Sequence, residues 1–138
     1  RTIDELNEEL DQRAVAVAPA LLELPGCGAL TAAKLLAEIG PISRFKSDAQ
    51  LARHSGVAPL EASSGKSQRH RLDRGGNRQL NAALYRIAIT QARYHPPARA
   101  YLERKQAEGK SKREAIRCLK RQLARTVFNS LKNEVRLT

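Results

Sequence analysis

The chain has 138 residues, about the length of one domain, and its 25 Lys and Arg against 14 Asp and Glu give a formal net charge of +11 at pH 7. A surplus this large indicates a polyanionic partner. Hydrophobic residues make up 41% of the composition and no apolar run approaches the length of a bilayer, which excludes a membrane-spanning class and favours a soluble globular domain.

The compartment and the completeness of the chain are also suggested by composition. Cys27 and Cys118 are far apart and have no companion Cys or His cluster, so neither a disulfide framework nor a zinc site is supported. No signal peptide is visible, and we expect a reducing, intracellular location. Because the chain contains no methionine, Arg1 is not expected to be the native start, and we interpret the sequence as a fragment of a longer protein.

The positive charge is concentrated in the second part of the chain. Residues 1–55 carry six Lys or Arg and eight Asp or Glu, a net −2, whereas residues 56–138 carry nineteen and six, a net +13. Charged residues on helices usually only solvate an exposed face. A surplus of this size makes that explanation incomplete, so residues 56–138 are the expected polyanion-binding part.

Helical signals dominate the first 55 residues. Thr2 and Glu5 form a capping-box pattern that predicts a helix over 3–17, and Pro19 opens the next turn. The elements expected after it are a short apolar helix with Leu21, Leu22 and Leu24 that stops at Pro25-Gly26-Cys27-Gly28, a helix over 29–39 with Leu30, Ala33, Leu35, Leu36 and Ile39 at helical spacing, and a helix that Ser47 and Gln50 cap and that reaches His54. Each piece is too short to be stable alone, so the pieces must pack together.

Residues 56–76 break every helical periodicity, and residues 56–72 are the one candidate for a short hairpin. A segment of this length without regular structure is uncommon in a compact domain unless it has a function or is disordered. The helical pattern resumes after Asn77 and predicts one helix that reaches Tyr94 and a second helix from Pro96 to Gly109. Ser111 and Glu114 form another capping box, which opens a long helix whose apolar stripe is Ile116, Leu119, Leu123, Val127 and Leu131.

The long C-terminal helix also carries a row of arginines on a different face from its apolar stripe. Arg113, Arg117, Arg121 and Arg125 follow i, i+4 spacing, and we call them the arginine row. Such a row is a candidate surface for a nucleic-acid backbone. Strand signals are weak, so the predicted fold class is mainly α, with a helix-hairpin-helix, several packed helices and a long basic loop.

The string from Leu24 to Leu35 matches the helix-hairpin-helix pattern of DNA-binding proteins. Glycines at 26 and 28 permit a positive φ and a close approach to phosphate, and the amides that begin the next helix donate hydrogen bonds. Thr31 belongs to the same string and Lys34 could add charge. Two helices joined by a glycine turn are also a common packing unit. We favour phosphate contact, because the string is more specific than a glycine pair.

Base-excision glycosylases use the same hairpin and are the enzymatic alternative. In their lyase members a catalytic lysine stands just after the neighbour of the second glycine, and an aspartate follows downstream. This chain has Leu30 at the lysine position, and Asp48 lies in a capping-box turn where a local structural role is sufficient. These differences disfavour the glycosylase alternative. Tyr85, Tyr94 and Tyr101 raise the question of a tyrosine recombinase, but no accompanying signature is apparent.

The segment 56–76, which we call the serine loop, combines small hydroxyls with cations. Ser63 and Ser64 precede Gly65, and five Lys or Arg with one Asp lie between Lys66 and Arg78. Attack on a phosphodiester needs a nucleophile and donors for the charged oxygens, although a serine must be activated. A loop that only clamps a backbone has the same composition, and spacing alone favours that simpler interpretation.

The order of the motifs resembles a known family. Hairpin, Gly56-Val57-Ala58-Pro59, Ser64-Gly65, a basic stretch and Arg74-Gly75-Gly76-Asn77-Arg78 before a helix look like the C-terminal transposase domain of the bridge-RNA-guided insertion-sequence transposases, to which the Piv DNA invertase is also similar. The resemblance covers about residues 21–131. It implies a serine that forms a covalent phosphoserine link to DNA, which maps to Ser64, with Ser63 as the alternative.

The hairpin string, the arginine row and the resemblance together give the remaining site, and the resemblance implies the partners and the domain plan. The expected DNA or RNA contacts are Gly26, Gly28, Thr31, Lys34, Lys66, Arg69, Arg71, Arg74, Asn77, Arg78, Arg113, Arg117, Arg121 and Arg125. The expected parts are a connector helix (1–18), the helix-hairpin-helix (19–40), the serine loop (56–76) and C-terminal helices (77–134). The implied partners are DNA, a guide RNA and further copies of the same protein in a dimer or tetramer. A membrane is not among them.

The chain departs from the family in what it omits. The family binds Mg²⁺ through four acidic residues of an N-terminal RuvC-like domain, and no cluster of Asp or Glu here could replace them. We therefore expect no metal or other cofactor in this chain, and we expect it to bind nucleic acid but to recombine it poorly by itself. The alternative function is a noncatalytic helix-hairpin-helix binding module.

Overall fold

The computed structural model describes residues 2–6, 18–58 and 76–137, and within those ranges the regular structure is helical and contains no strand. The mainly α fold class is confirmed. After a helical turn at residues 3–6, the order is α2 (Pro19–Glu23), α3 (Ala29–Ile39), the 3-10 turn η1 (Ile42–Arg44), α4 (Asp48–His54), α6 (Arg78–Tyr94), α7 (Pro96–Ala107) and α8 (Lys112–Leu137).

The helices begin where their capping residues predict. The Thr2 hydroxyl accepts from the Glu5 amide, and the Thr2 amide donates to the Glu5 carboxylate, as a capping box requires. Ser111 and Glu114 make the same reciprocal pair ahead of α8, at 3.1 Å in both directions. Ser47 accepts from the Gln50 amide before α4. These local hydrogen bonds satisfy amides that have no partner inside their own helix.

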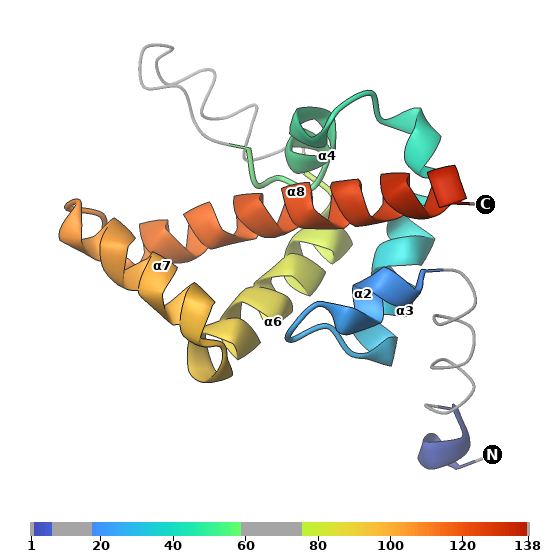
Figure 1. Ribbon diagram of the computed structural model, residues 1–138, viewed down its shortest axis with the longest axis horizontal. Coiled ribbons are helices and arrows are strands. Elements are labelled where there is room, and N and C mark those ends of the chain that lie inside the picture. The colour runs from blue at the N-terminus through green and yellow to red at the C-terminus, as the bar shows by residue number, and fades with distance from the viewer. Residues whose placement is uncertain (1, 7–17, 59–75, 138) are drawn as a thin grey trace.

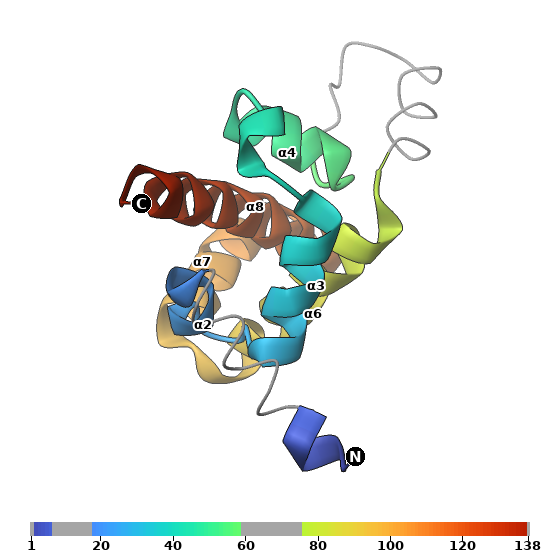
Figure 2. The same cartoon turned by 90° about the vertical axis from the view of Figure 1, so that its right-hand side faces the viewer.

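α8 is the central element of the packing. It crosses the length of the molecule and contacts α2, η1, α4, α6 and α7 (Figure 1). α6 in turn packs on α3, so that the α2–α3 hairpin lies on one side of α8 and α4 lies on the other (Figures 1 and 2). The short helices are therefore held by long ones, as their length requires.

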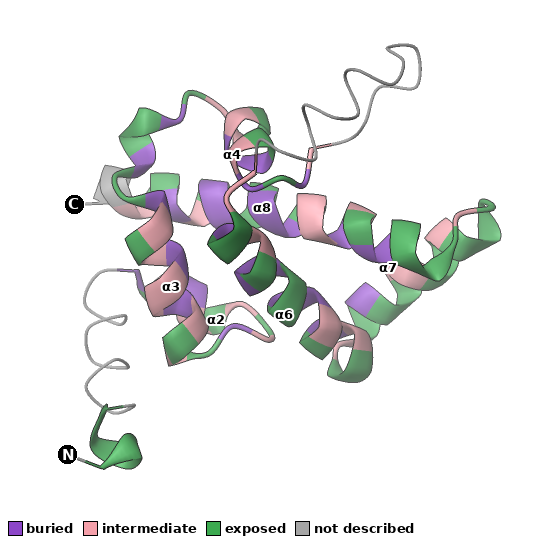
Figure 3. Ribbon diagram, turned by 180° about the vertical axis from the view of Figure 1, so that it is seen from behind, coloured by how far each residue is buried: buried purple, intermediate pink, exposed green. Residues whose placement is uncertain are grey.

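The buried face of α8 agrees with the predicted stripe. All five predicted stripe residues are buried, and the row of buried apolar side chains is Ala115, Ile116, Leu119, Leu123, Ala124, Val127, Phe128 and Leu131. Figure 3 shows buried positions on α8, α6 and α3 turned toward one another. One contiguous core, from Ala18 to Leu131, thus joins the helices α2 to α8.

Four local features differ from the sequence pattern. Leu30 is 55% exposed although it fits the apolar spacing of α3. The 3-10 turn η1, which buries Ile42, was not predicted. α7 ends at Ala107, before the expected Gly109, because Gly109 takes a φ of +100° and the Lys110 amide turns back to the Lys105 carbonyl. α8 continues to Leu137.

Two predictions fall partly outside the described residues: most of the helix over 3–17, and the short hairpin over 56–72. No helix in the described ranges is both long and apolar enough to cross a membrane.

Candidate nucleic-acid interface and the base of the serine loop

The turn between α2 and α3 is fixed against α6 by Gly26. This residue has a φ of +85°, and a Cβ placed on it would lie 3.0 Å from the Ile87 carbonyl oxygen and 3.3 Å from the Thr90 Cβ. The buried side chain of Gln91 donates to the Pro25 carbonyl at 2.7 Å. The close approach that Gly26 permits is therefore an approach to a neighbouring helix within the same chain.

Gly28 lies at the opposite, open side of that turn. It is the N-cap of α3 with a φ of −86°, so the left-handed backbone that the glycine pair permits is used only at Gly26. A Cβ on Gly28 would meet no atom within 4 Å, and no side chain caps the helix. The exposed Leu30 belongs to the same first turn. This end of α3 can receive a phosphate at its amides.

The remaining hairpin residues lie further along α3. Thr31 and Lys34 are half-buried, one and two turns from the open end. The structure thus contains the two helices and the glycine turn of the predicted hairpin, and its contact with DNA stays a prediction.

Six residues assigned to the serine loop fall outside the described ranges: Ser63, Ser64, Lys66, Arg69, Arg71 and Arg74. Both ends of the segment are described, and they meet. A Cβ on Gly76 would lie 2.5 Å from the Gly56 Cα and 2.8 Å from the Gly56 nitrogen. Since both are backbone atoms, only glycine fits at position 76 without moving the chain.

Gly56 also ends α4. Its φ is +73°, and the Val57 amide donates to the Ala52 carbonyl while the Gly56 amide donates to Arg53. This is the hydrogen-bond pattern of a Schellman motif, which a glycine in the left-handed region terminates. The serine loop therefore starts at a defined helix end.

Asn77 secures the other end. Its backbone amide donates to the His54 carbonyl at 2.6 Å. Its side-chain oxygen caps α6 by accepting from the Leu80 amide at 3.0 Å, and its side-chain amide donates to Glu38 at 3.1 Å. Both polar ends of the Asn77 side chain therefore have partners inside the chain, whereas Arg78, the next predicted nucleic-acid contact, is exposed.

A second asparagine, one turn into α6, ties the same region to α8. The Asn81 side-chain amide donates to the Gly56 carbonyl at 3.3 Å, and its oxygen accepts from the Lys120 ammonium at 2.9 Å. The ammonium also lies 5.7 Å from the ring centroid of Tyr85. Burial, with the nearby charge of Arg117, lowers the pKa of Lys120. We call Gly56, Gly76, His54, Asn77 and Asn81 the loop base.

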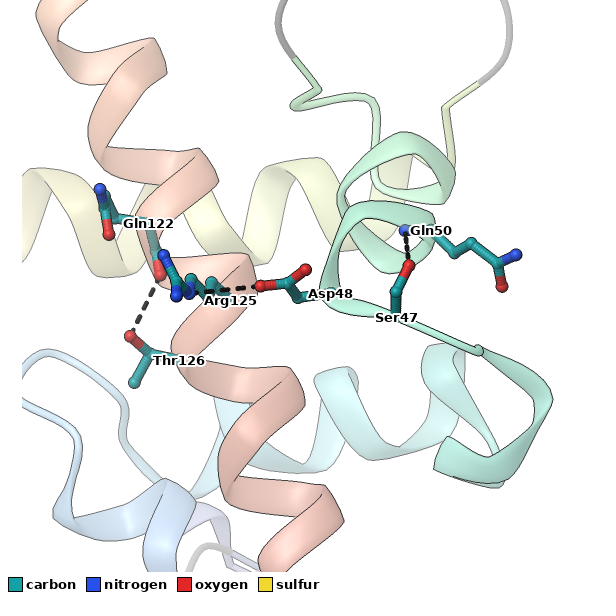
Figure 4. A network of polar contacts seen from close by, with 6 residues as sticks. All are labelled: Ser47, Asp48, Gln50, Gln122, Arg125 and Thr126. Carbon is teal, nitrogen blue, oxygen red and sulfur yellow. Dashed lines mark hydrogen bonds and ion pairs between the residues drawn. The ribbon is translucent and has the colours of Figure 1, made fainter.

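The arginine row runs along α8, as its spacing predicts. Arg113, Arg117 and Arg125 are exposed and Arg121 is half-buried. Arg125 forms an ion pair with Asp48 of α4, with 3.3 Å between Nε and Oδ2 (Figure 4). Asp48 follows the N-cap Ser47, so the last arginine of the row also helps to hold α4 against α8. Because the pair is exposed, its contribution to stability is small.

The metal-binding and thiol chemistry of the described part is limited. Within residues 2–6, 18–58 and 76–137, no group of three or more His, Cys, Asp and Glu could hold a metal ion. Both cysteines are free, and burial raises the pKa of the Cys27 thiol to about 11. A thiol with such a pKa is a poor nucleophile at neutral pH.

The described chain is thus a helical domain with an open helix end, a row of arginines and a loop whose ends are held together. A family model described as the transposase IS116/IS110/IS902 family matches residues 18–103. The chain belongs to this family.

Three relatives illustrate the family. An uncharacterized 43.6 kDa protein of insertion element IS110 from Streptomyces coelicolor is 37% identical over 118 residues, which is 85% of this chain and 29% of the relative. An uncharacterized 42 kDa protein of IS900 from Mycobacterium paratuberculosis is 32% identical over 82% of this chain and 29% of its own. The pilin gene-inverting protein of Moraxella bovis is 33% identical over 83% of this chain and 35% of its own. The chain spans about a third of these relatives or less.

Sequence reasoning missed the residues that fasten the turn and the loop base. Gln91, Glu38, Asn81 and Lys120 each reach a partner on another element. One signal was available: Gln91 is a polar residue on the buried face of α6. A buried polar side chain requires a hydrogen-bond partner.

Proposed function

We propose that this chain is the DNA-binding and nucleophile-bearing domain of a transposase or site-specific recombinase. The observation that carries the proposal is the shared family of insertion-element proteins and pilin gene-inverting proteins, to which the chain belongs. The closed loop base supports it, because a segment with three serines and several cations leaves and re-enters the helical domain at one fixed place.

In the proposed reaction, Ser64, or alternatively Ser63, attacks a DNA phosphodiester. The serine oxygen forms a bond to phosphorus, its proton passes to a base, and the displaced sugar oxygen leaves with a proton as a hydroxyl. The phosphoserine ester retains the free energy of the broken phosphodiester bond. A hydroxyl of a second DNA strand can therefore attack the phosphorus, which joins the DNA end to that strand and releases the serine. Arginines of the serine loop stabilise the charge on the phosphate oxygens.

Nucleic acid is proposed to bind across several surfaces of the domain. The open end of α3 at Gly28 supplies amide donors, and the arginine row with Arg78 supplies cations. A guide RNA and further copies of the protein complete the proposed assembly, in the bacterial cytoplasm. The Mg²⁺ that the family resemblance implies is proposed to bind to a separate RuvC-like domain, and no step proposed for this chain uses it.

Serine substitution in the full-length recombinase tests the chemistry. Ser64→Ala should abolish the covalent protein–DNA adduct, detected by denaturing electrophoresis with labelled DNA, and leave DNA affinity almost unchanged. Ser67→Ala, in the same segment, is the matched control. If the adduct survives Ser64→Ala but not Ser63→Ala, the nucleophile is Ser63. If it survives both single changes and the double change, neither serine is the nucleophile.

A second function, a noncatalytic binding module, is favoured by one observation: the uncapped end of α3 needs no serine to bind phosphate. It predicts DNA binding without any adduct in the full-length protein. Both functions require binding that weakens steeply as salt increases, because several phosphate contacts release counterions. Residues 1–138 alone should bind nucleic acid and show little or no strand transfer, and efficient transfer by them would contradict our assignment.

A further inference from the structure

Lys120 differs from most of the basic residues of α8 in being half-buried. Arg113, Arg117 and Lys132 are exposed, whereas Lys120 is half-buried between α8 and α6. Its ammonium reaches the Asn81 side-chain oxygen at 2.9 Å and approaches the face of Tyr85. Burying an ammonium has a cost, which is why its pKa is lowered. A lysine that only solvated the helix surface would not carry this cost.

The contact with Lys120 determines how Asn81 is oriented. A lysine ammonium only donates hydrogen bonds, so it selects the carbonyl oxygen of the Asn81 amide and turns the NH₂ group the other way. That NH₂ group donates to the Gly56 carbonyl at 3.3 Å. With the amide reversed, two oxygens would face each other at Gly56. Lys120 therefore acts on the first residue of the serine loop without touching it.

The last residues of the loop are held from the same side. Gly76 is packed against Gly56, and the next residue, Asn77, donates its backbone amide to His54. A shift of Gly56 would therefore be transmitted to Gly76 and Asn77. The spacing of the two loop ends depends on the Asn81 amide, and the orientation of that amide depends on Lys120.

We propose that Lys120 is a positioning residue for the serine loop: by orienting the Asn81 amide it holds the Gly56 carbonyl, and with it the two described ends of the loop, Gly56 and Gly76. The consequence for DNA chemistry rests on the proposed function, whereas the effect on the loop base is independent of it.

The first measurement is hydrogen exchange at the loop base in the full-length protein. Lys120→Met removes the donor and retains an apolar stem. We expect the Asn77 and Val57 amides to exchange about tenfold faster, the effect of losing one hydrogen bond from a charged donor. Lys132→Met, the same change on an exposed part of the same helix, should leave both amides protected. Lys120→Arg supplies a side chain that, like lysine, only donates hydrogen bonds, and it should restore most of the protection.

An isosteric change separates the two contacts of Asn81. Asn81→Asp retains an acceptor for Lys120 but replaces the NH₂ donor at Gly56 with an oxygen. We expect a thermal unfolding midpoint close to that of the unmodified protein and faster exchange of the Asn77 amide. If the fold were merely weakened, the unfolding midpoint and the exchange of all core amides would change together.

The chemical measurement is the rate of adduct formation on a DNA substrate. Lys120→Met should slow it at least about tenfold relative to Lys132→Met, with DNA affinity changed less than about twofold, since no phosphate contact is removed. Unchanged loop-base exchange in Lys120→Met and Asn81→Asp would overturn the proposal, and so would an unchanged adduct rate in an active recombinase.

Failure of the proposed function has a different signature. If the unmodified protein forms no adduct, or forms one without Ser63 and Ser64, the serine mechanism is wrong. Exchange at Asn77 and Val57 then decides the proposal alone: faster exchange in Lys120→Met supports the positioning of the loop ends, and unchanged exchange refutes it.

Discussion

The domain has two glycine pairs, Gly26 with Gly28 at the hairpin and Gly56 with Gly76 at the loop base, and the two pairs have different functions in the structure. At the hairpin, Gly26 packs against α6 while Gly28 faces open space, so one glycine serves the fold and the other leaves a helix end accessible. At the loop base, Gly56 and Gly76 pack against each other, and both serve closure. A glycine pair therefore indicates a close approach, but the approaching group can be the protein's own backbone or a ligand.

Gly76→Ala breaks the loop base and should have the largest effect on stability. The new Cβ would collide with backbone atoms of Gly56 at 2.5 Å and 2.8 Å, and neither can rotate away. We expect a loss of about 3 kcal/mol in the free energy of unfolding. Urea denaturation measures it, and an unchanged midpoint would show that the glycines do not touch in solution.

Gly26→Ala should have a smaller effect on the hairpin. Its Cβ would press on the Ile87 carbonyl at 3.0 Å, and the φ of +85° is strained for any side chain. A loss of about 2 kcal/mol is expected, because α2 and α3 can shift slightly on α6. Thermal unfolding at matched concentration compares it with Gly76→Ala. A loss larger than that of Gly76→Ala would reverse the ranking of the two pairs.

Ser111→Ala gives a reference for a helix end that the chain caps itself. Loss of this cap should destabilise the domain by about 1 kcal/mol. Hydrogen bonds that the backbone amide and the side-chain hydroxyl of Ser111 donate to the carboxylate lower the pKa of Glu114, so the stabilisation by its ionised carboxylate is present above the ordinary pKa of glutamate and disappears as the pH falls through the lowered value. Glu114→Gln should flatten this acid dependence of the unfolding midpoint.

Gly28→Asp tests the open helix end and should change stability least. The position has extended backbone and free space, so an aspartate can cap α3 and raise stability by a few tenths of a kcal/mol, roughly the advantage over glycine at an N-cap. Its charge should repel a phosphate. DNA affinity, measured by fluorescence anisotropy, should fall several-fold below that of Gly28→Asn, which has the same shape. Equal affinities would remove Gly28 from the interface.

The parts of the fold that depend on neighbouring residues were predictable. α3 was predicted with its observed ends, because Gly28 and Gly40 delimit an unbroken apolar pattern. The buried stripe of α8 and the Ser111 cap followed in the same way from short spacings. Leu30 shows the limit of such patterns: it has the right spacing, yet it lies in the first turn of α3 and is exposed.

Contacts between distant residues could not be predicted from one sequence. Lys120 lies 39 positions from Asn81, and Asn77 the same number from Glu38, while Gln91 lies 66 positions from Pro25. Helical periodicity assigns each of them to a face, but it does not say which side chain of another helix that face meets. Asn77 is instructive, since a residue predicted to bind nucleic acid caps α6 and holds Glu38. The serines themselves remain predictions.

The contact between Gly56 and Gly76 brings together the two points at which the serine loop joins the helical domain. The conformational entropy lost when two such points are brought together changes only slowly with the number of residues between them. Helices α4 and α6 therefore tolerate a longer or shorter segment between them, provided that its two glycines are kept. Segments of different length and charge can therefore be grafted between α4 and α6 without altering the core.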